Sequence, residues 1–216
     1  MQVCGVDEAG RGSVLGPLVV AGISIEKSKI RKLKSIGVKD SKKLSAARRK
    51  ILYDEIIEIV DDYEIIPIYP RSIDPIVRRH KLNALEAKYM GRIIDRLKPN
   101  ISYVDSCDVK PARFANTISQ YVHNIPVKSY HHADSRFHVV SAASILAKVT
   151  RDKFIYKLNR YYTLGSGYPS DPITIRFLSI YVKKYKTLPS FTRKSWKPVQ
   201  ALLKKHHLLN IATTIK

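Results

Sequence analysis

Short apolar runs rich in β-branched residues recur along the chain and predict five strands. The first two runs, Val3–Val6 and Pro17–Ile25, are continuous enough to be buried strands. Tyr63–Pro70 is predicted to be an edge strand, because proline cannot donate to a sheet ladder. Ile101–Asp105 and Ile125–Tyr130 are the fourth and fifth predicted strands.

Apolar residues at helical spacing predict helices between and after these strands. The predicted helices are Ser45 to about Asp61, Asn83 to about Leu97, Lys110–Val122, Val139 to about Tyr162, Asp171 to about Tyr185, and Val199–Leu209. Ser45, and Asp171 followed by Pro172, are suitable N-caps. Asn83 and Glu86 resemble a capping pair.

The order of these elements favours an α/β fold with a mixed sheet. Two strands come first, strands and helices alternate next, and helices alone follow residue 138. Arg71–Lys81 is expected to be a short helix or a loop, and Lys27–Lys39 has only a weak pattern.

The charge of the chain indicates a polyanionic partner, most simply nucleic acid. Its 39 Lys and Arg against 18 Asp and Glu give a net charge of +21. Residues 151–216 hold 14 Lys and Arg and 2 Asp, so they contribute +12 of this charge. The alternatives are a basic thermophile-like surface or a protein of membrane surfaces. We predict a catalytic domain over residues 1–170 and a basic helical region over 171–216 that binds substrate.

Other features of composition narrow the class of protein. No apolar run approaches the ~20 residues that span a bilayer, and no signal peptide is seen, so a cytoplasmic protein without a membrane partner is expected.

Cys4 and Cys107 are too few and too isolated for a zinc site. With the first and fourth strands parallel and Asp7 level with Asp105, the two cysteines would lie about 16 Å apart along the strands, beyond the ~7 Å limit for a disulfide. We therefore predict two free thiols.

Carboxylates follow two of the predicted strands. Asp7 and Glu8 end the first strand and Asp105 ends the fourth, and such ends gather at one edge of a parallel sheet. Carboxylates without cysteine suit Mg²⁺ or Mn²⁺, and two such ions about 4 Å apart can stabilise both oxygens of a phosphodiester displacement. Asp134, in an acid-poor stretch, is the natural fourth ligand. Taken alone, each of these acids could instead cap a turn, and for Asp105 and Asp134 alone that is the favoured interpretation.

A glycine-flanked arginine follows the first two acids. The segment Gly10-Arg11-Gly12 is either a plain tight turn or a set of amides and a guanidinium suited to a phosphate or a 2′-hydroxyl. Tyr168 lies in a Gly- and Pro-rich loop, as a surface aromatic or as a stacking platform for a sugar or base.

Several ordered motifs resemble those of the ribonuclease HII family, in its archaeal branch, over Val6 to about Trp196. They are Asp7-Glu8-Ala9-Gly10-Arg11-Gly12, Asp40-Ser41-Lys42-Lys43-Leu44, Tyr103-Val104-Asp105, Ala133-Asp134, Ser141 to Asp152, and Gly165 to Pro172. The resemblance implies an RNase H-like fold, with a five-stranded mixed β-sheet flanked by helices and a helical C-terminal region. It also implies a metal-dependent type 2 ribonuclease H, of class EC 3.1.26.4.

The implied activity is cleavage of RNA in RNA–DNA hybrids and nicking 5′ to single ribonucleotides in duplex DNA, leaving 3′-hydroxyl and 5′-phosphate ends. The implied catalytic and metal-binding residues are Asp7, Glu8, Asp105 and Asp134, with two Mn²⁺ or Mg²⁺ ions. The implied substrate-binding residues are Gly10, Arg11, Gly12 and Tyr168, and we expect Lys42, Lys43 and Lys148 to hold phosphates.

Two other classes of protein stay open at this point. A non-catalytic basic nucleic-acid-binding protein explains the charge but not the acids, and another nuclease of this fold, such as a junction resolvase, would need no 2′-hydroxyl. Asn210–Lys216 shows no clear sliding-clamp motif, and we expect a monomer.

Overall fold

The computed structural model describes residues 1–38 and 44–206, which form two compact units. The first unit comprises Met1–Ala9, Val19–Ile66 and Asn83–Thr150, and the second comprises Gly10–Leu18, Pro67–Leu82 and the chain from Arg151 onward. The predicted division near residue 170 stays a prediction about function.

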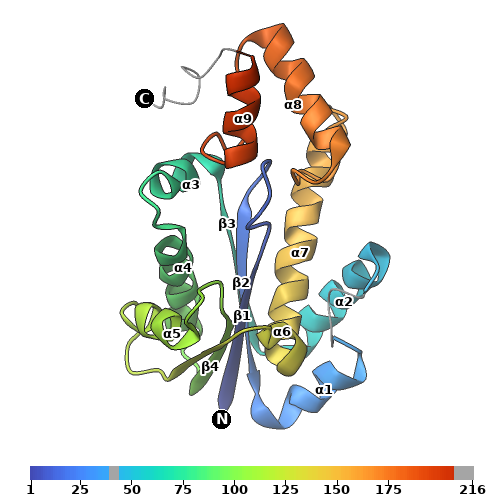
Figure 1. Cartoon of the computed structure of the whole chain (residues 1–216). Coiled ribbons are helices and arrows are strands. Elements are labelled where there is room, and N and C mark those ends of the chain that lie inside the picture. Colours follow the sequence, from blue (N-terminus) through green and yellow to red (C-terminus); the bar gives the residue numbers. More distant parts are fainter. Residues whose placement is uncertain (39–43, 207–216) are drawn as a thin grey trace. The chain divides into compact units, whose positions relative to one another are not determined.

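A five-stranded mixed sheet forms the centre of the first unit, as predicted (Figure 1). Its strands are β1 (Gln2–Ala9), β2 (Leu18–Glu26), β3 (Asp62–Ile68), β4 (Ile101–Asp105) and β5 (Val127–Tyr130). Their order is β3-β2-β1-β4-β5, which places β3 at an edge, where its proline costs no ladder bond. β1 pairs with β2 antiparallel and with β4 parallel, and β4 pairs with β5 parallel.

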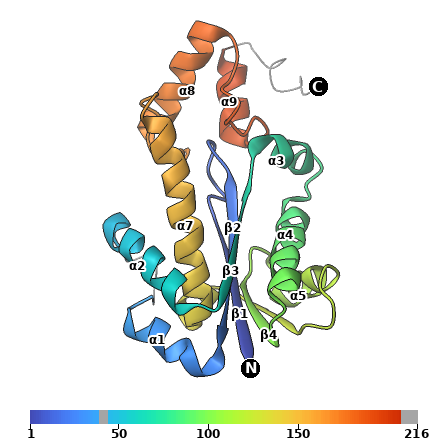
Figure 2. The ribbon, with the colours of Figure 1, turned by 180° about the vertical axis from the view of Figure 1, so that it is seen from behind.

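Helices cover both faces of this sheet. α4 (Leu82–Leu97) and α5 (Pro111–Ser119) lie on one face, and α1 (Ile30–Ser35), α2 (Ala46–Ile59) and the first turns of α7 (His138–Asn159) lie on the other (Figures 1 and 2). Two glycines allow the close packing. A Cβ on Gly5 would lie 2.2 Å from the Val139 carbonyl carbon, and one on Gly22 would lie 2.4 Å from an Ile93 methyl group.

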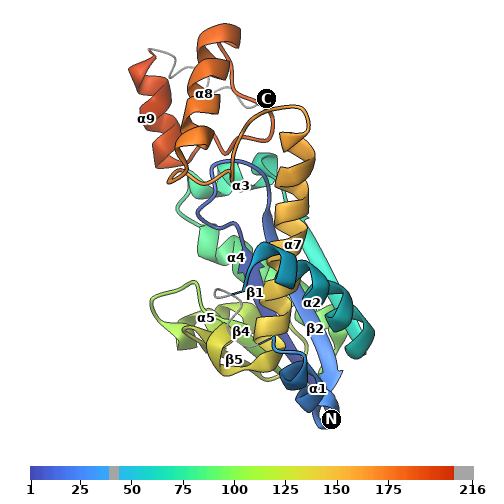
Figure 3. The same cartoon turned by 90° about the vertical axis from the view of Figure 1, so that its right-hand side faces the viewer.

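The second unit has a core of its own. Val14 and Leu15 pack there with residues of α8 (Pro172–Tyr185) and α9 (Lys197–Lys205), including Leu178 and Leu203. Figure 3 shows α8 and α9 side by side. The unit also holds α3 (Pro70–Val77) and the end of α7, whose chain passes from the first unit to the second after Thr150.

The described helices begin largely where their caps predict. The Ser45 hydroxyl accepts the amide of Arg48 at 3.2 Å, and the Asp171 carboxylate accepts the amide of Ile173 at 2.9 Å, so both N-cap predictions are confirmed. The Asn83 capping pair is wrong, because α4 begins at Leu82 and the Asn83 side-chain amide donates instead to Asp108, at 3.0 Å.

The remaining differences concern short elements. The weak pattern of Lys27–Lys39 predicts no element, but Lys27–Lys29 form a 3-10 turn that leads into α1. A one-turn helix that the pattern did not predict, α6 (Ala133–Arg136), precedes α7. α9 begins two residues before the predicted Val199, and the predicted end at Leu209 lies outside the described residues.

Two further predictions can be compared with this fold. Cys4 and Cys107 are thiols outside any disulfide, as predicted, and burial raises the pKa of Cys4 to about 12. In the described part of the chain, every helix is too short or too polar to cross a bilayer.

Candidate active site and specificity loops

The pairing of β1 with β4 brings two of the predicted acids to one level of the sheet. Val6 lies opposite Val104, so the next residues along the two parallel strands are Asp7 and Asp105. Asp7 is buried, with 5% of its surface exposed, and its Oδ1 accepts the Glu8 amide at 2.7 Å. The strand register alone therefore gathers these carboxylates at one edge.

Asp105 also connects this edge to the short helix α6. Its Oδ1 accepts the amide of Ala133, the first residue of α6, at 2.6 Å. Asp134 follows directly and is 3% exposed. The bond places the start of α6, with Asp134 in its first turn, against the end of β4.

The electrostatics of Asp7 reflect this gathering of acids. Burial raises the pKa of Asp7 well above its ordinary range, and the negative charges of Glu8 and Asp105 raise it further. A hydrogen bond from Ser144 and the positive charge of Lys148 act in the opposite direction. Ser144 and Lys148 are four residues apart on α7 and so share one face of that helix.

These acids fit a hard divalent cation in their chemistry. Carboxylate oxygens are the ligands that Mg²⁺ and Mn²⁺ prefer, and a bound cation would offset the mutual repulsion that raises the pKa of Asp7. Within the described ranges, no group of three or more His, Cys, Asp or Glu side chains is arranged so that it could hold a metal ion as it stands. The donor set is therefore suited to the metal, although its side chains are not closed around a single point.

The Gly10–Gly12 segment forms a turn in the second unit. Gly10 has a φ of 82°, in the left-handed region that favours glycine, and its carbonyl accepts the amide of Ser13 at 3.2 Å. The Ser13 hydroxyl and the Val14 amide both donate to the Gly167 carbonyl, at 2.8 Å each. The turn is therefore joined to the loop that carries Tyr168.

Arg151, in the C-terminal half of α7, fixes the same loop. It is only 4% exposed, and its guanidinium donates to the Ser13 hydroxyl at 3.0 Å and to the Ser166 carbonyl. The same group lies over the ring of Tyr168, 4.4 Å from its centroid. Tyr168 is half-buried, so its ring is held in place on one side while part of it stays accessible.

Arg193 and Asp74 belong to the same unit, and sequence reasoning missed both. Arg193 is fully buried, and it donates to the carbonyls of Arg11 at 3.0 Å and Gly16 at 3.1 Å. Burial, and then the charge of Arg151, lower the pKa of Arg193 to about 9. Asp74 is buried as well and accepts the amides of Lys194 and Ser195. No local pattern marks these residues, because their partners lie more than 100 positions away in the chain.

The lysines that we expected to hold phosphates differ in their placement. Lys42 and Lys43 lie outside the described residues. Lys148 is half-buried on α7 and acts electrostatically on Asp7. Its position therefore favours a role beside the carboxylates.

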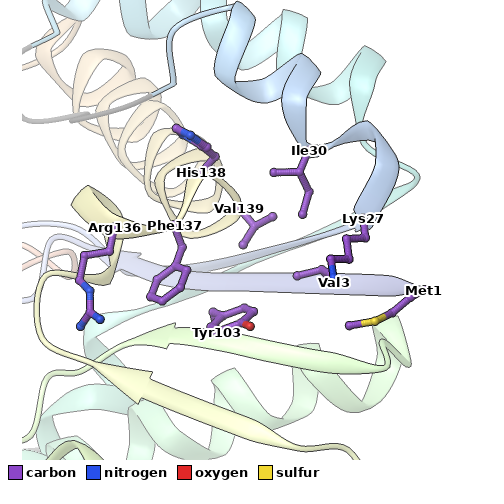
Figure 4. Close-up of a pocket in the computed structure, with 9 residues that line it drawn as sticks. All are labelled: Met1, Val3, Lys27, Ile30, Tyr103, Arg136, Phe137, His138 and Val139. Carbon is purple, nitrogen blue, oxygen red and sulfur yellow. The ribbon is translucent and has the colours of Figure 1, made fainter.

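A cavity of about 250 Å³ in the first unit lies elsewhere (Figure 4). Figure 4 shows the rings of Tyr103 and Phe137 facing each other, and their centroids are 4.5 Å apart. Among the described residues that line this cavity, none belongs to the predicted site. The carboxylates are therefore not part of this cavity.

Known proteins resemble this chain over almost its whole length. The family model described as Ribonuclease HII matches residues 4–199. Ribonuclease HII of Cenarchaeum symbiosum is 52% identical over 202 residues, covering 94% of this chain and 98% of that protein.

Two solved structures resemble the fold closely. The ribonuclease H2 of Pyrococcus horikoshii has a TM-score of 0.90 and 44% identity, covering 96% of this chain and 99% of that one. Ribonuclease HII of Archaeoglobus fulgidus, solved in its complex with PCNA, has a TM-score of 0.84 and 39% identity, covering 91% of this chain and 96% of that one. The chain belongs to the ribonuclease HII family.

Proposed function

We propose that this chain is an endonuclease that cleaves RNA in RNA–DNA hybrids and nicks duplex DNA 5′ to single embedded ribonucleotides. Membership of the ribonuclease HII family supports this activity. The observation that carries the proposal is the placement of Asp7 and Asp105 at one level of the sheet, with Glu8 and α6 attached to them.

Four carboxylates would carry the chemistry. Asp7, Glu8 and Asp105 would hold two Mg²⁺ or Mn²⁺ ions, and Asp134 would complete the set and help to position the attacking water. Bound ions of this kind activate a water and stabilise the leaving oxygen, which gives 3′-hydroxyl and 5′-phosphate ends. The raised pKa of Asp7 supports this role, since a bound cation would offset the repulsion from Glu8 and Asp105.

The choice of substrate would come from the second unit. Arg11 and the amides of Gly10 and Gly12 would read the 2′-hydroxyl, the group that distinguishes RNA from DNA at one nucleotide. Tyr168 would stack on the adjoining nucleotide. The hydrogen bonds that join the turn to the Tyr168 loop through Ser13 support their acting together.

The binding partners, location and oligomeric state of the chain are proposed as well. We propose that the +21 chain binds hybrid and ribonucleotide-containing duplexes as a cytoplasmic monomer, with Lys42 and Lys43 on phosphates and residues 171–216 as a substrate-binding region. The relative from Archaeoglobus fulgidus was solved with PCNA. The predicted lack of a clamp motif in Asn210–Lys216 falls outside the described residues, so a binding assay with PCNA decides it.

The test is incubation with a DNA duplex that carries one ribonucleotide, with Mg²⁺ or Mn²⁺ and then with a chelator. We expect a single nick 5′ to the ribonucleotide that requires the metal, and none in the matching all-DNA duplex. Binding without a nick would favour a non-catalytic binding protein. Cleavage of a branched DNA without ribonucleotides would favour a junction resolvase.

A further inference from the structure

A groove of about 630 Å³ lies beside the Gly10–Gly12 turn, wholly within the second unit. Three separate stretches of the chain line it. They contribute Arg11 and Gly12 from the turn, Arg78 and His80 from the segment just after α3, and Trp196 and Lys197 from the start of α9. The groove is therefore continuous with the turn to which we assign reading of the 2′-hydroxyl.

The charge of the groove is of one sign. Arg11, Arg78 and Lys197 are cationic, and the described residues that line the groove include no Asp or Glu. The nearby Asp74 is 2% exposed, and it is engaged by the amides of Lys194 at 3.1 Å and Ser195 at 2.9 Å, and by the Ser195 hydroxyl at 2.6 Å. The negative charge of Asp74 thus holds the backbone behind the groove and is shielded from its surface.

One buried side chain joins two walls of the groove. Arg193 donates to the carbonyl of Arg11, and its guanidinium lies over the ring of Trp196, 4.9 Å from the centroid. The Arg193 amide also donates to the Val14 carbonyl at 2.9 Å. The groove is therefore preformed by interactions of the core. Binding of a ligand then costs less conformational entropy, because the groove is already ordered.

We propose that this groove binds the sugar–phosphate backbone of the duplex DNA next to the nucleotide that Arg11 contacts. The proposal rests on the proposed function, because it takes Arg11 as a residue that contacts the ribonucleotide. Arg78 and Lys197 would neutralise phosphates, and the half-buried Trp196 would pack against the sugars. Phosphate contacts of this kind fix the register of a protein on its substrate without reading sequence.

The experiment uses the double variant Arg78→Gln with Lys197→Gln in the full chain. Log affinity falls with log salt at a slope of about −0.9 for each phosphate contact. Loss of two contacts should therefore make the slope on an all-DNA duplex less negative by about 2. With a duplex that carries one ribonucleotide, KM should rise while kcat stays unchanged. Circular dichroism and Tm verify that the variant is folded.

A matched control is Arg31→Gln with Lys32→Gln, which removes the same charge from two exposed residues of α1. The salt slope and KM of the control should remain close to those of the parent. An equal loss in both variants would mean that only total charge matters, and it would overturn the proposal. So would a groove variant whose salt slope and KM equal those of the parent.

Shortening the duplex locates the contact. The DNA is trimmed in steps on the 5′ side or on the 3′ side of the ribonucleotide. The difference in KM between the parent and the groove variant should vanish on trimming one side only, and persistence of the difference on the shortest duplexes would contradict a contact with flanking DNA. If only the groove proposal is wrong, the parent still nicks the duplex in the presence of metal. If the proposed function is wrong, the parent does not nick the duplex.

Discussion

The two units differ in the groups that surround their buried charged side chains. In the first, Asp7 is buried beside Glu8 and Asp105, and burial and repulsion raise its pKa. In the second, Arg151 and Arg193 are buried, but their guanidinium groups donate to carbonyl oxygens and lie over aromatic rings. The buried charges of the second unit thus lie against neutral carbonyl oxygens and aromatic rings, whereas the buried Asp7 of the first lies beside two other carboxylates.

This difference separates two tasks that a selective nuclease must perform. In the proposed function, the acids on adjoining strand ends would hold the metal ions, and the strand register places Asp7 level with Asp105. The loops that buried arginines hold in place would contact the nucleotide. We expect substitutions in the first unit to change whether any substrate is cut, and substitutions in the second to change which substrate is cut.

Removal of the Tyr168 ring should have the largest effect in the second unit. Stacking of a base on an aromatic ring is worth about 1–3 kcal/mol, so Tyr168→Ala should lower kcat/KM on a duplex with one ribonucleotide roughly 5- to 150-fold. Tyr168→Phe keeps the ring over Arg151 and should remain close to the parent. Equal kcat/KM values for Tyr168→Ala and the parent would remove Tyr168 from substrate binding.

The two glycines of the turn should differ in their effect on stability. A side chain at Gly10 is strained by its φ of 82° and would lie 3.1 Å from the Pro17 carbonyl, so Gly10→Ala should lower the free energy of unfolding by about 1–2 kcal/mol. At Gly12 nothing lies within 4 Å of an added Cβ, so Gly12→Ala should be nearly neutral. Urea denaturation measures both. Equal losses would show that the turn has a different conformation from the one described.

Loss of the α8 cap should cost less. The Asp171 carboxylate accepts the amides of Ser166 at 2.6 Å and Ile173 at 2.9 Å, so Asp171→Ala should lower the free energy of unfolding by about 1 kcal/mol. The control is Asp54→Ala, which removes an exposed acid from α2 and should change the free energy by less than about 0.5 kcal/mol. Thermal unfolding of both variants makes the comparison, and no difference between them would contradict the cap.

A further effect should be seen only in chelated protein. Because the pKa of Asp7 is raised by folding, its contribution to stability is complete below pH ~3.8 and is lost as the pH rises through the folded pKa. Asp7→Asn lacks that titration, so its Tm should exceed that of the parent at neutral pH, and the difference should shrink in acid. A Tm for the variant below that of the parent at neutral pH would show that the contacts made by the Asp7 carboxylate outweigh its burial and repulsion.

The strands and the acids at their ends could be predicted from local pattern, because an apolar run that stops at a carboxylate records both burial and polarity. The level pairing of Asp7 with Asp105 also followed from assuming parallel strands, and the register agrees with it. The short helix α6 could not be predicted, because a tertiary bond from the Ala133 amide to Asp105 holds it in place.

The residues that hold the second unit together were harder to predict. Arg151, Arg193 and Asp74 look like ordinary members of basic or polar segments, and their partners are distant in the chain. The charge of Lys148 predicts a phosphate contact, while the periodicity of α7 places it with Ser144 beside Asp7. Charge alone could not decide between these two positions.

Single-turnover nicking by Asp7→Asn tests the central claim most directly. The variant, in excess over a duplex with one ribonucleotide, is compared with the parent in Mn²⁺, so that every duplex is bound. Loss of several kcal/mol of charge stabilisation by metal ions should slow the nick by about a thousandfold, while binding of the duplex stays intact. A nicking rate within about tenfold of that of the parent would show that Asp7 does not hold the catalytic metal.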